Sequence, residues 1–326
     1  MVILCDGCRS YTGKVIVKDL IARGHTVVNY TRAKVEDPGT EQFINIHGEL
    51  DDLARLARVM KDYNVDAVIH LAAQSSPFVS HAVPLETAKA NFMNTVTVLE
   101  AARLADVDRV IMFSSDCGVG SVGVDVPITT KVRNRPYTVY GVTKTACELL
   151  AGSYNFVYGM SCMTLRIPHI IGQVRTPFEI STEVMNAAIH GETYVRPEGI
   201  DTTYAFLHLD SLSEAVVAAV EVPKEKVYVD GLYNVCDYNA TMKDVLEMMK
   251  EIEPSFTYDV GPGYETINGV QSEWLQGKWY CEETTRDLGW KPKYTLESGF
   301  RTFWNEWVKA KEEGTLPPAS AFISLK

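Results

Sequence analysis

The fold of this chain is decided by the stretch Val2-Ile3-Leu4-Cys5-Asp6-Gly7-Cys8-Arg9-Ser10-Tyr11-Thr12-Gly13. Its first residues are apolar, as in a short buried strand, and an amphipathic pattern predicts a helix from Lys14 to Arg23, closed by Gly24. Glycines between a strand and a helix allow a tight turn and let a pyrophosphate approach the N–H groups at the helix start. The stretch therefore predicts a dinucleotide-binding turn, with an ordinary strand-to-helix connection as the alternative.

The strand-and-helix pattern continues along the first half of the chain. Further apolar strands are predicted at Val27, Ala67 and Val110, and helical stretches separate them through about residue 150. This alternation is typical of a parallel doubly wound sheet, which binds ligands at the carboxyl ends of its strands. We predict an α/β protein with a Rossmann-type domain over residues 1–165 and a smaller C-terminal α/β region, mainly for substrate binding, over residues 166–326. We expect the chain to cross back from this region to the first domain.

Tyr140 and Lys144 form a candidate catalytic pair. Four residues apart on a helix, they bring a phenol beside an ammonium group. A phenol has a pKa of about 10, and a nearby cation favours the phenolate, which can exchange protons with an alcohol. Ser115, at the end of the strand that contains Val110, could hold a substrate oxygen. The alternatives are an exposed pair on a helix surface for the first two residues and a helix cap for Ser115.

Several segments, in order along most of the chain, resemble those of the extended short-chain dehydrogenases/reductases, which include sugar-nucleotide epimerases and dehydratases. The matching segments are Gly7/Ser10/Gly13 (Gly-x-x-Gly-x-x-Gly), Gly48–Asp52 (the adenine-contacting segment), Val68–Ala73 (His-x-Ala-Ala), Asn91 with Thr95, Val110–Ser115, Tyr140/Lys144, Thr164–Gly172 and Leu288–Pro292. The resemblance implies a nicotinamide cofactor, with Tyr140 as the acid/base and Ser115 and Lys144 assisting. It also implies a homodimer that associates through a helical bundle.

The resemblance, together with the charges at the end of the predicted strand His25–Arg32, gives a set of expected cofactor-binding residues. These are Gly7, Arg9, Ser10, Tyr11, Thr12, Gly13, Thr31, Arg32, Glu49, Leu50, Leu71, Ala72, Ala73, Asn91, Tyr140, Lys144 and Pro168. The hydroxyl of Ser10, which replaces the middle glycine of the motif, could itself bond a phosphate oxygen.

The identity of the cofactor is argued from charge at the end of the predicted strand His25–Arg32. NAD sites usually place an acid there for the ribose hydroxyls, whereas a 2′-phosphate favours an arginine and no acid. Thr31 and Arg32 fit the second case, and Arg9 and Lys34 could add positive charge. We therefore favour NADP over NAD, with solvated surface arginines as the alternative.

The candidate substrate-binding residues depart from the family pattern in two places. They are Gln74, Ser75, Arg135, His169, Arg175 and Tyr204. His169 replaces the usual asparagine, and Tyr204 stands where the family has an arginine that commonly meets the nucleotide diphosphate. Loss of a bidentate phosphate donor weakens the assignment of a sugar nucleotide as substrate.

A basic loop precedes the catalytic tyrosine. Lys131, Arg133 and Arg135 could attract a phosphate or carboxylate of the substrate, or they could be a solvated loop on an acidic protein. The first reading predicts an anionic substrate, for which Arg175 is a further candidate contact.

Asp116 and Cys117 follow Ser115 at the positions where sugar 4,6-dehydratases of the family carry a pair of acids. Asp116 could act as an acid and Cys117 could exchange a proton, so both are candidate catalytic residues. A small buried cysteine is the alternative for Cys117.

Composition excludes several classes of function. The 326 residues are 46% hydrophobic, with a formal net charge of -11, which argues against general affinity for nucleic acid. The sequence has no leader and no apolar run long enough to span a membrane, so a cytoplasmic protein is expected. Seven scattered cysteines suit reduced thiols, and no metal site is predicted; we assign no redox role to the pair Cys5/Cys8.

Four hypotheses for the function remain. The leading one is an NAD(P)-dependent oxidoreductase or epimerase that acts by hydride transfer on a secondary alcohol or ketone of a sugar-like, anionic small molecule. The others are a sugar-nucleotide 4,6-dehydratase, a simple dehydrogenase or reductase of a non-nucleotide sugar acid or polyol, and a non-catalytic NADP-binding regulator.

Overall fold

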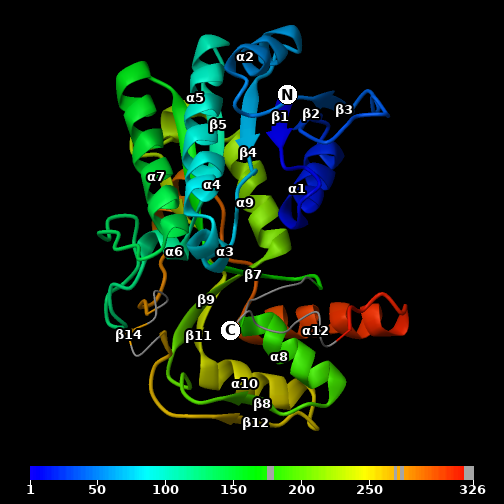
Figure 1. Cartoon of the computed structure of the whole chain (residues 1–326), viewed down its shortest axis with the longest axis vertical. Helices are drawn as coiled ribbons and strands as arrows, with labels where there is room; N and C mark the ends of the chain where they lie inside the picture. The colour runs from blue at the N-terminus through cyan, green and yellow to red at the C-terminus, as the bar shows by residue number, and fades with distance from the viewer. Residues whose placement is uncertain (175–179, 268–269, 272–274, 319–326) are drawn as a thin grey trace.

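The computed structural model describes residues 1–174, 180–267, 270–271 and 275–318. A seven-stranded parallel sheet forms the upper half of the molecule in Figure 1. In spatial order its strands are β10 (Leu232–Asn234), β6 (Ser161–Ile167), β5 (Arg109–Ser115), β4 (Ala67–His70), β1 (Val2–Asp6), β2 (Thr26–Thr31) and β3 (Phe43–His47). The prediction of a Rossmann-type sheet is confirmed. The edge strand β10 comes from far along the chain.

Helices cover both faces of this sheet because its strands are apolar on both sides. In β1, Ile3 and Cys5 belong to one core and Leu4 to the core on the opposite face. The first core includes helices α1 (Tyr11–Ala22) and α9 (Leu209–Glu221), and the second includes α2 (Leu53–Asp62), α5 (Asn94–Leu104) and α7 (Val139–Tyr158). Figure 1 shows α5 and α7 side by side on the left of the sheet.

Helix α1 begins at Tyr11, three residues before the predicted start at Lys14. The cause is the cap: the Ser10 hydroxyl accepts a hydrogen bond from the N–H of Gly13, at 3.0 Å. The helix therefore starts directly at the end of the glycine turn.

Short helices and turns connect the longer elements. They are α3 (Pro77–Ala82), α4 (Pro84–Ala88) and the π-helical turn η1 (Lys89–Met93) between β4 and α5, α6 (Asp116–Val119) after β5, and the 3₁₀ turn η2 (Lys224–Lys226) after α9.

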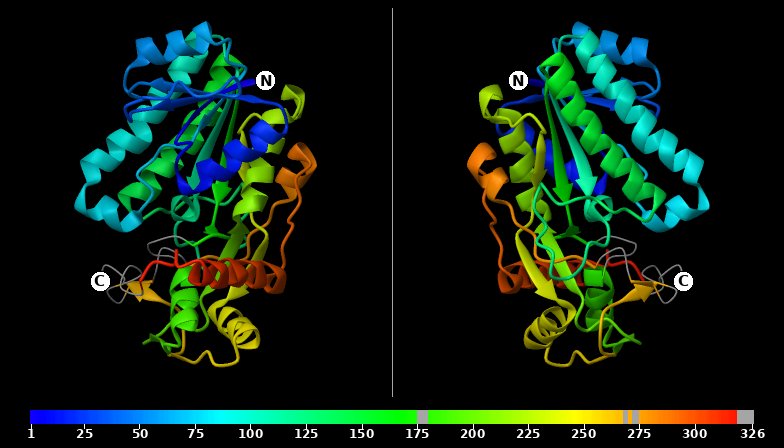
Figure 2. Two further views of the ribbon diagram at one scale, coloured as in Figure 1. Left: turned by 90° about the vertical axis from the view of Figure 1, so that its right-hand side faces the viewer. Right: turned by 90° about the vertical axis from the view of Figure 1, so that its left-hand side faces the viewer.

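The second half of the chain builds a smaller region below the carboxyl edge of the large sheet, as Figure 2 shows. It contains a three-stranded sheet of β11 (Tyr238–Thr241), β9 (Thr203–His208) and β7 (His169–Ile171), and the pairs β12 (Tyr258–Val260) with β8 (Tyr194–Arg196) and β13 (Thr266–Ile267) with β14 (Val270–Gln271). Its helices are α8 (Ile180–His190), α10 (Met242–Ile252) and α12 (Leu296–Glu312), while α11 (Glu282–Leu288) lies near β10. Phe206 and Trp307 lie in its separate core. The carboxyl ends of the large sheet thus face this region.

Candidate active site

The glycine turn between β1 and α1 is packed so closely that side chains would not fit. Gly7 has φ +71°, and a Cβ on it would lie 2.9 Å from the Cβ of Leu71. A Cβ on Gly13 would lie 2.3 Å from the carbonyl oxygen of Gly7. Arg9 and Ser10 are exposed at the start of the helix. The turn therefore presents an open helix N-terminus, which suits the pyrophosphate of a dinucleotide.

We expect Gly13→Ala to lower the free energy of unfolding by about 1–3 kcal/mol, because the added methyl group forces the turn and the helix apart. We expect cofactor affinity to fall at least about tenfold with it, since the N–H groups that would meet the phosphates move. Urea unfolding and calorimetric titration with NAD(H) and NADP(H) measure the two effects. Gly152→Ala is the matched control: Gly152 also lies in a helix, its added Cβ would meet nothing closer than 3.5 Å, and a small gain in stability is expected. Equal effects of both substitutions would contradict the prediction.

Behind the turn, Asp6 joins the ends of β1 and β4. One carboxylate oxygen accepts hydrogen bonds from the N–H groups of Leu71 and Ala72, at 2.7 and 2.6 Å, and the other lies 2.6 Å from Nδ1 of His70. These bonds hold Leu71, Ala72 and the following Ala73 beside the glycine turn. Three of the predicted cofactor-binding residues therefore lie together with Gly7.

Asn91 fixes the next part of the same loop. Its side-chain amide exchanges hydrogen bonds with the backbone of Gln74, at 2.8 and 3.0 Å, and donates to Thr143 Oγ1 on α7, at 3.1 Å. Gln74 is half-buried, and Ser75 beside it is exposed. Asn91 is itself buried, so it holds the loop in place from behind.

Ser115, Tyr140 and Lys144 come together from β5 and α7. Ser115 is the last residue of β5 and also caps α6, since its Oγ accepts from the N–H of Cys117 at 3.2 Å. Tyr140 lies in the first turn of α7, and Lys144 Nζ lies 5.8 Å from the centre of its ring. Both side chains are buried. The pair is therefore part of the interior of the site and not an exposed pair on the helix surface.

The ammonium group of Lys144 is held against the strand. Its Nζ donates a hydrogen bond to the carbonyl oxygen of Phe113 in β5, at 2.8 Å. Burial lowers the pKa of Lys144 below its ordinary value, while Cys147 and Asp6 act in the opposite direction. A cation in this place is fixed in position relative to the Tyr140 ring.

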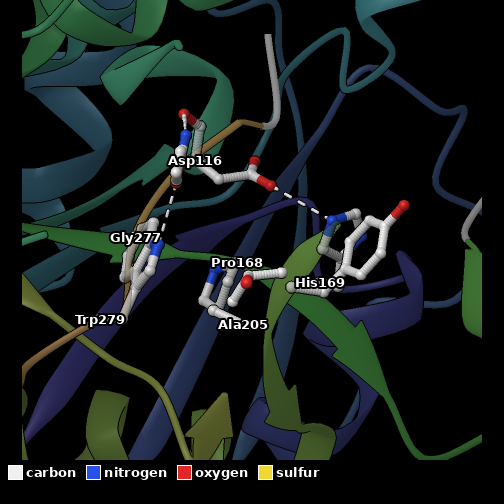
Figure 3. Close-up of a pocket in the computed structure, with 9 residues that line it drawn as sticks. Asp116, Pro168, His169, Ala205, Gly277 and Trp279 are labelled. Atoms are coloured by element: carbon white, nitrogen blue, oxygen red, sulfur yellow. Dashed lines mark hydrogen bonds and ion pairs between the residues drawn. The ribbon is translucent and has the colours of Figure 1, made fainter. Parts of the chain in front are cut away.

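A small pocket opens beside Ser115, between the end of β5 and the smaller region (Figure 3). Asp116 and His169 face each other across it, with 3.5 Å between Oδ2 of the carboxylate and Nε2 of the ring. Its lining residues are Asp116, Pro168, His169, Thr203, Tyr204, Ala205, Gln276, Gly277 and Trp279. Three residues expected at the substrate or cofactor, Pro168, His169 and Tyr204, thus lie together.

Tyr204 is tied to acidic and basic side chains from other elements. Its hydroxyl donates to Glu265 Oε2 at 3.1 Å, and Arg196 bonds both Glu265 and Glu183 at 2.6 Å. Burial raises the pKa of the Tyr204 phenol well above its usual range, and the nearby Glu265 carboxylate adds to the effect. The position of the family's arginine is therefore taken by a neutral, buried phenol.

The remaining predicted residues lie around the edges of the site or outside the described part of the chain. Thr31 is the last residue of β2 and Arg32 follows it. Glu49 and Leu50 follow β3 at the neighbouring carboxyl end, and Arg32 and Glu49 are exposed. Tyr11 bonds the backbone of Gln173, and Thr12 follows it in the first turn of α1. Arg135 is exposed, with its N–H bonded to the carbonyl of Val119, and Cys117 is buried. Arg175 lies outside the described residues.

The sequence analysis missed several residues of the site, among them Gln276, Trp279 and Glu265. Gln276 donates to the carbonyl oxygens of Asp116 and Gly120 and accepts from the indole of Trp279. Glu265 binds Tyr204, as described above. Gln276, Trp279 and Glu265 lie in irregular loops that have no hydrophobic period, so no local signal marks them.

The described residues contain no cluster of histidine, cysteine or acidic side chains that could hold a metal ion. No helix within the described ranges is both long and apolar enough to cross a bilayer.

Comparison with known proteins decides the family. The model of the NAD-dependent epimerase/dehydratase family matches residues 3–236. The chain belongs to this family. An uncharacterised epimerase/dehydratase of Staphylococcus aureus (strain USA300) is 25% identical over 264 residues, which are 77% of this chain and 78% of that protein.

Solved structures of family members share the fold. A UDP-glucose 4-epimerase from Thermotoga maritima, with UDP-glucose, has a TM-score of 0.78 at 20% identity, over 95% of this chain and 100% of the other. A UDP-glucuronic acid 4-epimerase from Bacillus cereus, with UDP-glucuronic acid and NAD, has 0.79 at 20% identity, over 94% and 98%. A GalE-like L-threonine dehydrogenase from Cupriavidus necator has 0.80 at 22% identity, over 94% and 99%. At these identities the likeness establishes the fold.

Proposed function

We propose that this epimerase/dehydratase family member is an NAD(P)-dependent enzyme that oxidises, transiently or in net, a secondary alcohol of a sugar-like small molecule. The observation that carries the proposal is the buried group of Ser115, Tyr140 and Lys144 at the end of β5. The strand β4 separates β5 from β1, whose carboxyl end carries the glycine turn. Cofactor and proton-transfer groups then share one edge of the sheet, as hydride transfer requires.

The side chains of the site divide the work of the reaction. Bound NAD(P) supplies a hydride acceptor. The Tyr140 phenolate would take the hydroxyl proton of the alcohol, and it would return that proton in the reverse direction. Lys144 stabilises the phenolate, and Ser115 orients the substrate oxygen.

The fit of the cofactor rests on the glycine turn. Gly7 and Gly13 leave no room for side chains, and the start of α1 is open. Arg9, Ser10, Thr12 and the segment Leu71–Ala73 would line the pyrophosphate. Asn91 holds this last segment from behind.

We propose NADP as the preferred cofactor because Thr31, the last residue of β2, and Arg32, which follows it, are not acidic. Arg32→Ala is expected to weaken NADP(H) binding about 10- to 100-fold, since a charge-assisted hydrogen bond contributes about 1.5–3 kcal/mol. NAD(H) binding should change by less than about threefold, because NAD has no 2′-phosphate. Calorimetric titration of the wild type and the variant tests this, with Arg58→Ala, an exposed arginine on α2, as the control. Tighter binding of NAD(H) to the wild-type protein would refute the preference.

A second candidate function, net dehydrogenation of a substrate that carries no nucleotide, is favoured by the Tyr204–Glu265 bond. Arg196 beside it is paired with two carboxylates and offers a diphosphate little free charge. Accumulation of reduced cofactor during turnover separates this candidate from an epimerase, which returns the hydride to its substrate.

We also propose that two copies associate through α5 and α7. Val142, Leu149 and Phe156 recur every seven residues on α7 and are 51%, 72% and 82% exposed. Apolar side chains on one helix face mark a partner surface.

Seven free thiols suit a reducing compartment, so we propose the cytoplasm as the place of action.

We expect light scattering to show a dimer, and the double substitution Leu149→Ser with Phe156→Ser to yield monomers. Central interface side chains commonly contribute about 2 kcal/mol or more each. Val195→Ser, at an exposed valine on β8, is the control and should leave the mass unchanged. A monomeric wild-type protein would rule out the proposed interface.

A further inference from the structure

Asp6 and His70 form a buried pair at the carboxyl ends of two neighbouring strands. In the parallel pair of β1 and β4, which Figure 1 shows side by side, Asp6 stands opposite His70. Oδ2 of the carboxylate lies 2.6 Å from Nδ1 of the ring, and the two side chains are 1% and 5% exposed. Oδ1 accepts the N–H groups of Leu71 and Ala72. These two donors stabilise the ionised carboxylate, so the proton between Oδ2 and Nδ1 belongs to the ring.

The second ring nitrogen of His70 also donates a hydrogen bond. Nε2 lies 3.1 Å from Oγ1 of Thr95 on α5. The single proton of the Thr95 hydroxyl goes to the carbonyl oxygen of Asn91, at 2.6 Å, because two oxygens this close repel each other without a proton between them. Thr95 can therefore only accept from the ring. A histidine that donates from both nitrogens is an imidazolium.

Other titratable groups near the pair are Cys5 in β1 and Lys144 and Cys147 in α7. A hydrogen bond and burial raise the pKa of Cys5, and burial raises the pKa of Cys147, so both thiols stay neutral. The Lys144 ammonium group is bound to a carbonyl oxygen of β5. Within the described ranges, His70 is therefore the cation in direct contact with Asp6.

We propose that His70 is a positioning residue that keeps both ring protons at neutral pH and neutralises Asp6 behind the pyrophosphate of the cofactor. The proposal rests on the proposed function, because it requires a dinucleotide at the glycine turn. An unpaired carboxylate next to Gly7 would repel a pyrophosphate, since charges in the interior are poorly screened. Paired with an imidazolium, Asp6 can hold the N–H groups of Leu71 and Ala72 without opposing the cofactor.

The protonation of His70 can be measured without cofactor. In protein with isotope-labelled histidine at about pH 8, where an exposed histidine is neutral, the nuclear magnetic resonance signals of His70 should show a proton on each ring nitrogen. His70→Asn removes these signals and so identifies them. Asp6→Asn should leave the ring neutral with its proton on Nε2, because the asparagine amide can donate to Nδ1. This change identifies the same signals even where His70→Asn does not fold. A wild-type ring with a single proton would overturn the proposal.

Calorimetric titration with NAD(H) and NADP(H) measures the effect of the charge. His70→Asn can keep an amide donor for Asp6 but removes the positive charge, so both cofactors should bind at least about tenfold more weakly. Asp6→Asn combined with His70→Asn should bind them within about threefold of the wild type, since no charge then remains to be balanced. His190→Gln, at an exposed histidine on α8, is the control and should change nothing.

Two titration results would overturn the proposal while the proposed function stands: unchanged affinity in His70→Asn, or a double variant that binds as weakly as His70→Asn. A wild-type protein that binds neither cofactor would refute the proposed function, and with it the role of the charge, even where both ring protons are found.

Discussion

Tyr140→Phe is expected to reduce turnover at least about 1,000-fold and to leave cofactor affinity within about threefold of the wild type. The substitution removes one hydroxyl and keeps the ring, which is buried at the start of α7. Loss of a positioned acid/base commonly costs about 100- to 10,000-fold in rate. Under the proposed function the glycine turn would make most of the cofactor contacts, so binding should persist. Cofactor reduction and calorimetric titration measure the two quantities.

Tyr137→Phe is the matched control for this prediction. Tyr137 lies three residues earlier and is 67% exposed, so removal of its hydroxyl should change neither rate nor affinity. A Tyr140→Phe variant that retains activity within about tenfold would mean that another group moves the hydroxyl proton. His169 would then be the first residue to test, since it is the imidazole held next to Ser115 through Asp116.

The fold could be predicted where its signals are local. The apolar strands at Val2, Val27, Ala67 and Val110 each gave a strand of the sheet, because strands buried on both faces must be continuously apolar. The position of β10 could not be predicted, since Leu232–Asn234 is too short to carry a pattern and pairs with β6 across a long stretch of chain. The predicted start of α1 was three residues too late, because the prediction followed the apolar periodicity and not the capping serine, Ser10.

The site shows the same division between local and long-range information. The pair Tyr140/Lys144 could be found because helix geometry brings residues four apart together. The contact between Asp116 and His169 depends on β5 and β6 running in register, with Ser115 opposite Ile167. The register of the strands is set by the packing of the whole sheet, so it cannot be predicted from the spacing of sequence motifs.

A buried ion pair next to β5 offers the second large effect. Arg166 on β6 and Glu148 on α7 are 2% and 5% exposed, and two bonds of 2.8 and 2.7 Å join them. Glu148 also accepts from the hydroxyl of Ser114 at 2.5 Å, and Arg166 donates to Asn134 Oδ1 at 2.8 Å. The pair therefore ties β5, just before Ser115, to β6, α7 and the basic loop.

Arg166→Ala is expected to lower the free energy of unfolding by about 3–5 kcal/mol, because it leaves the Glu148 carboxylate buried without its counter-ion. The double substitution Arg166→Met with Glu148→Leu should recover most of this loss, since no charge then remains to be buried. Arg301→Ala breaks an exposed pair with Glu297 on α12 and should cost less than about 1 kcal/mol. Urea unfolding of the three variants measures these differences. An Arg166→Ala variant as stable as Arg301→Ala would show that water reaches Glu148, and that the end of β5 is held by its sheet bonds and not by this pair.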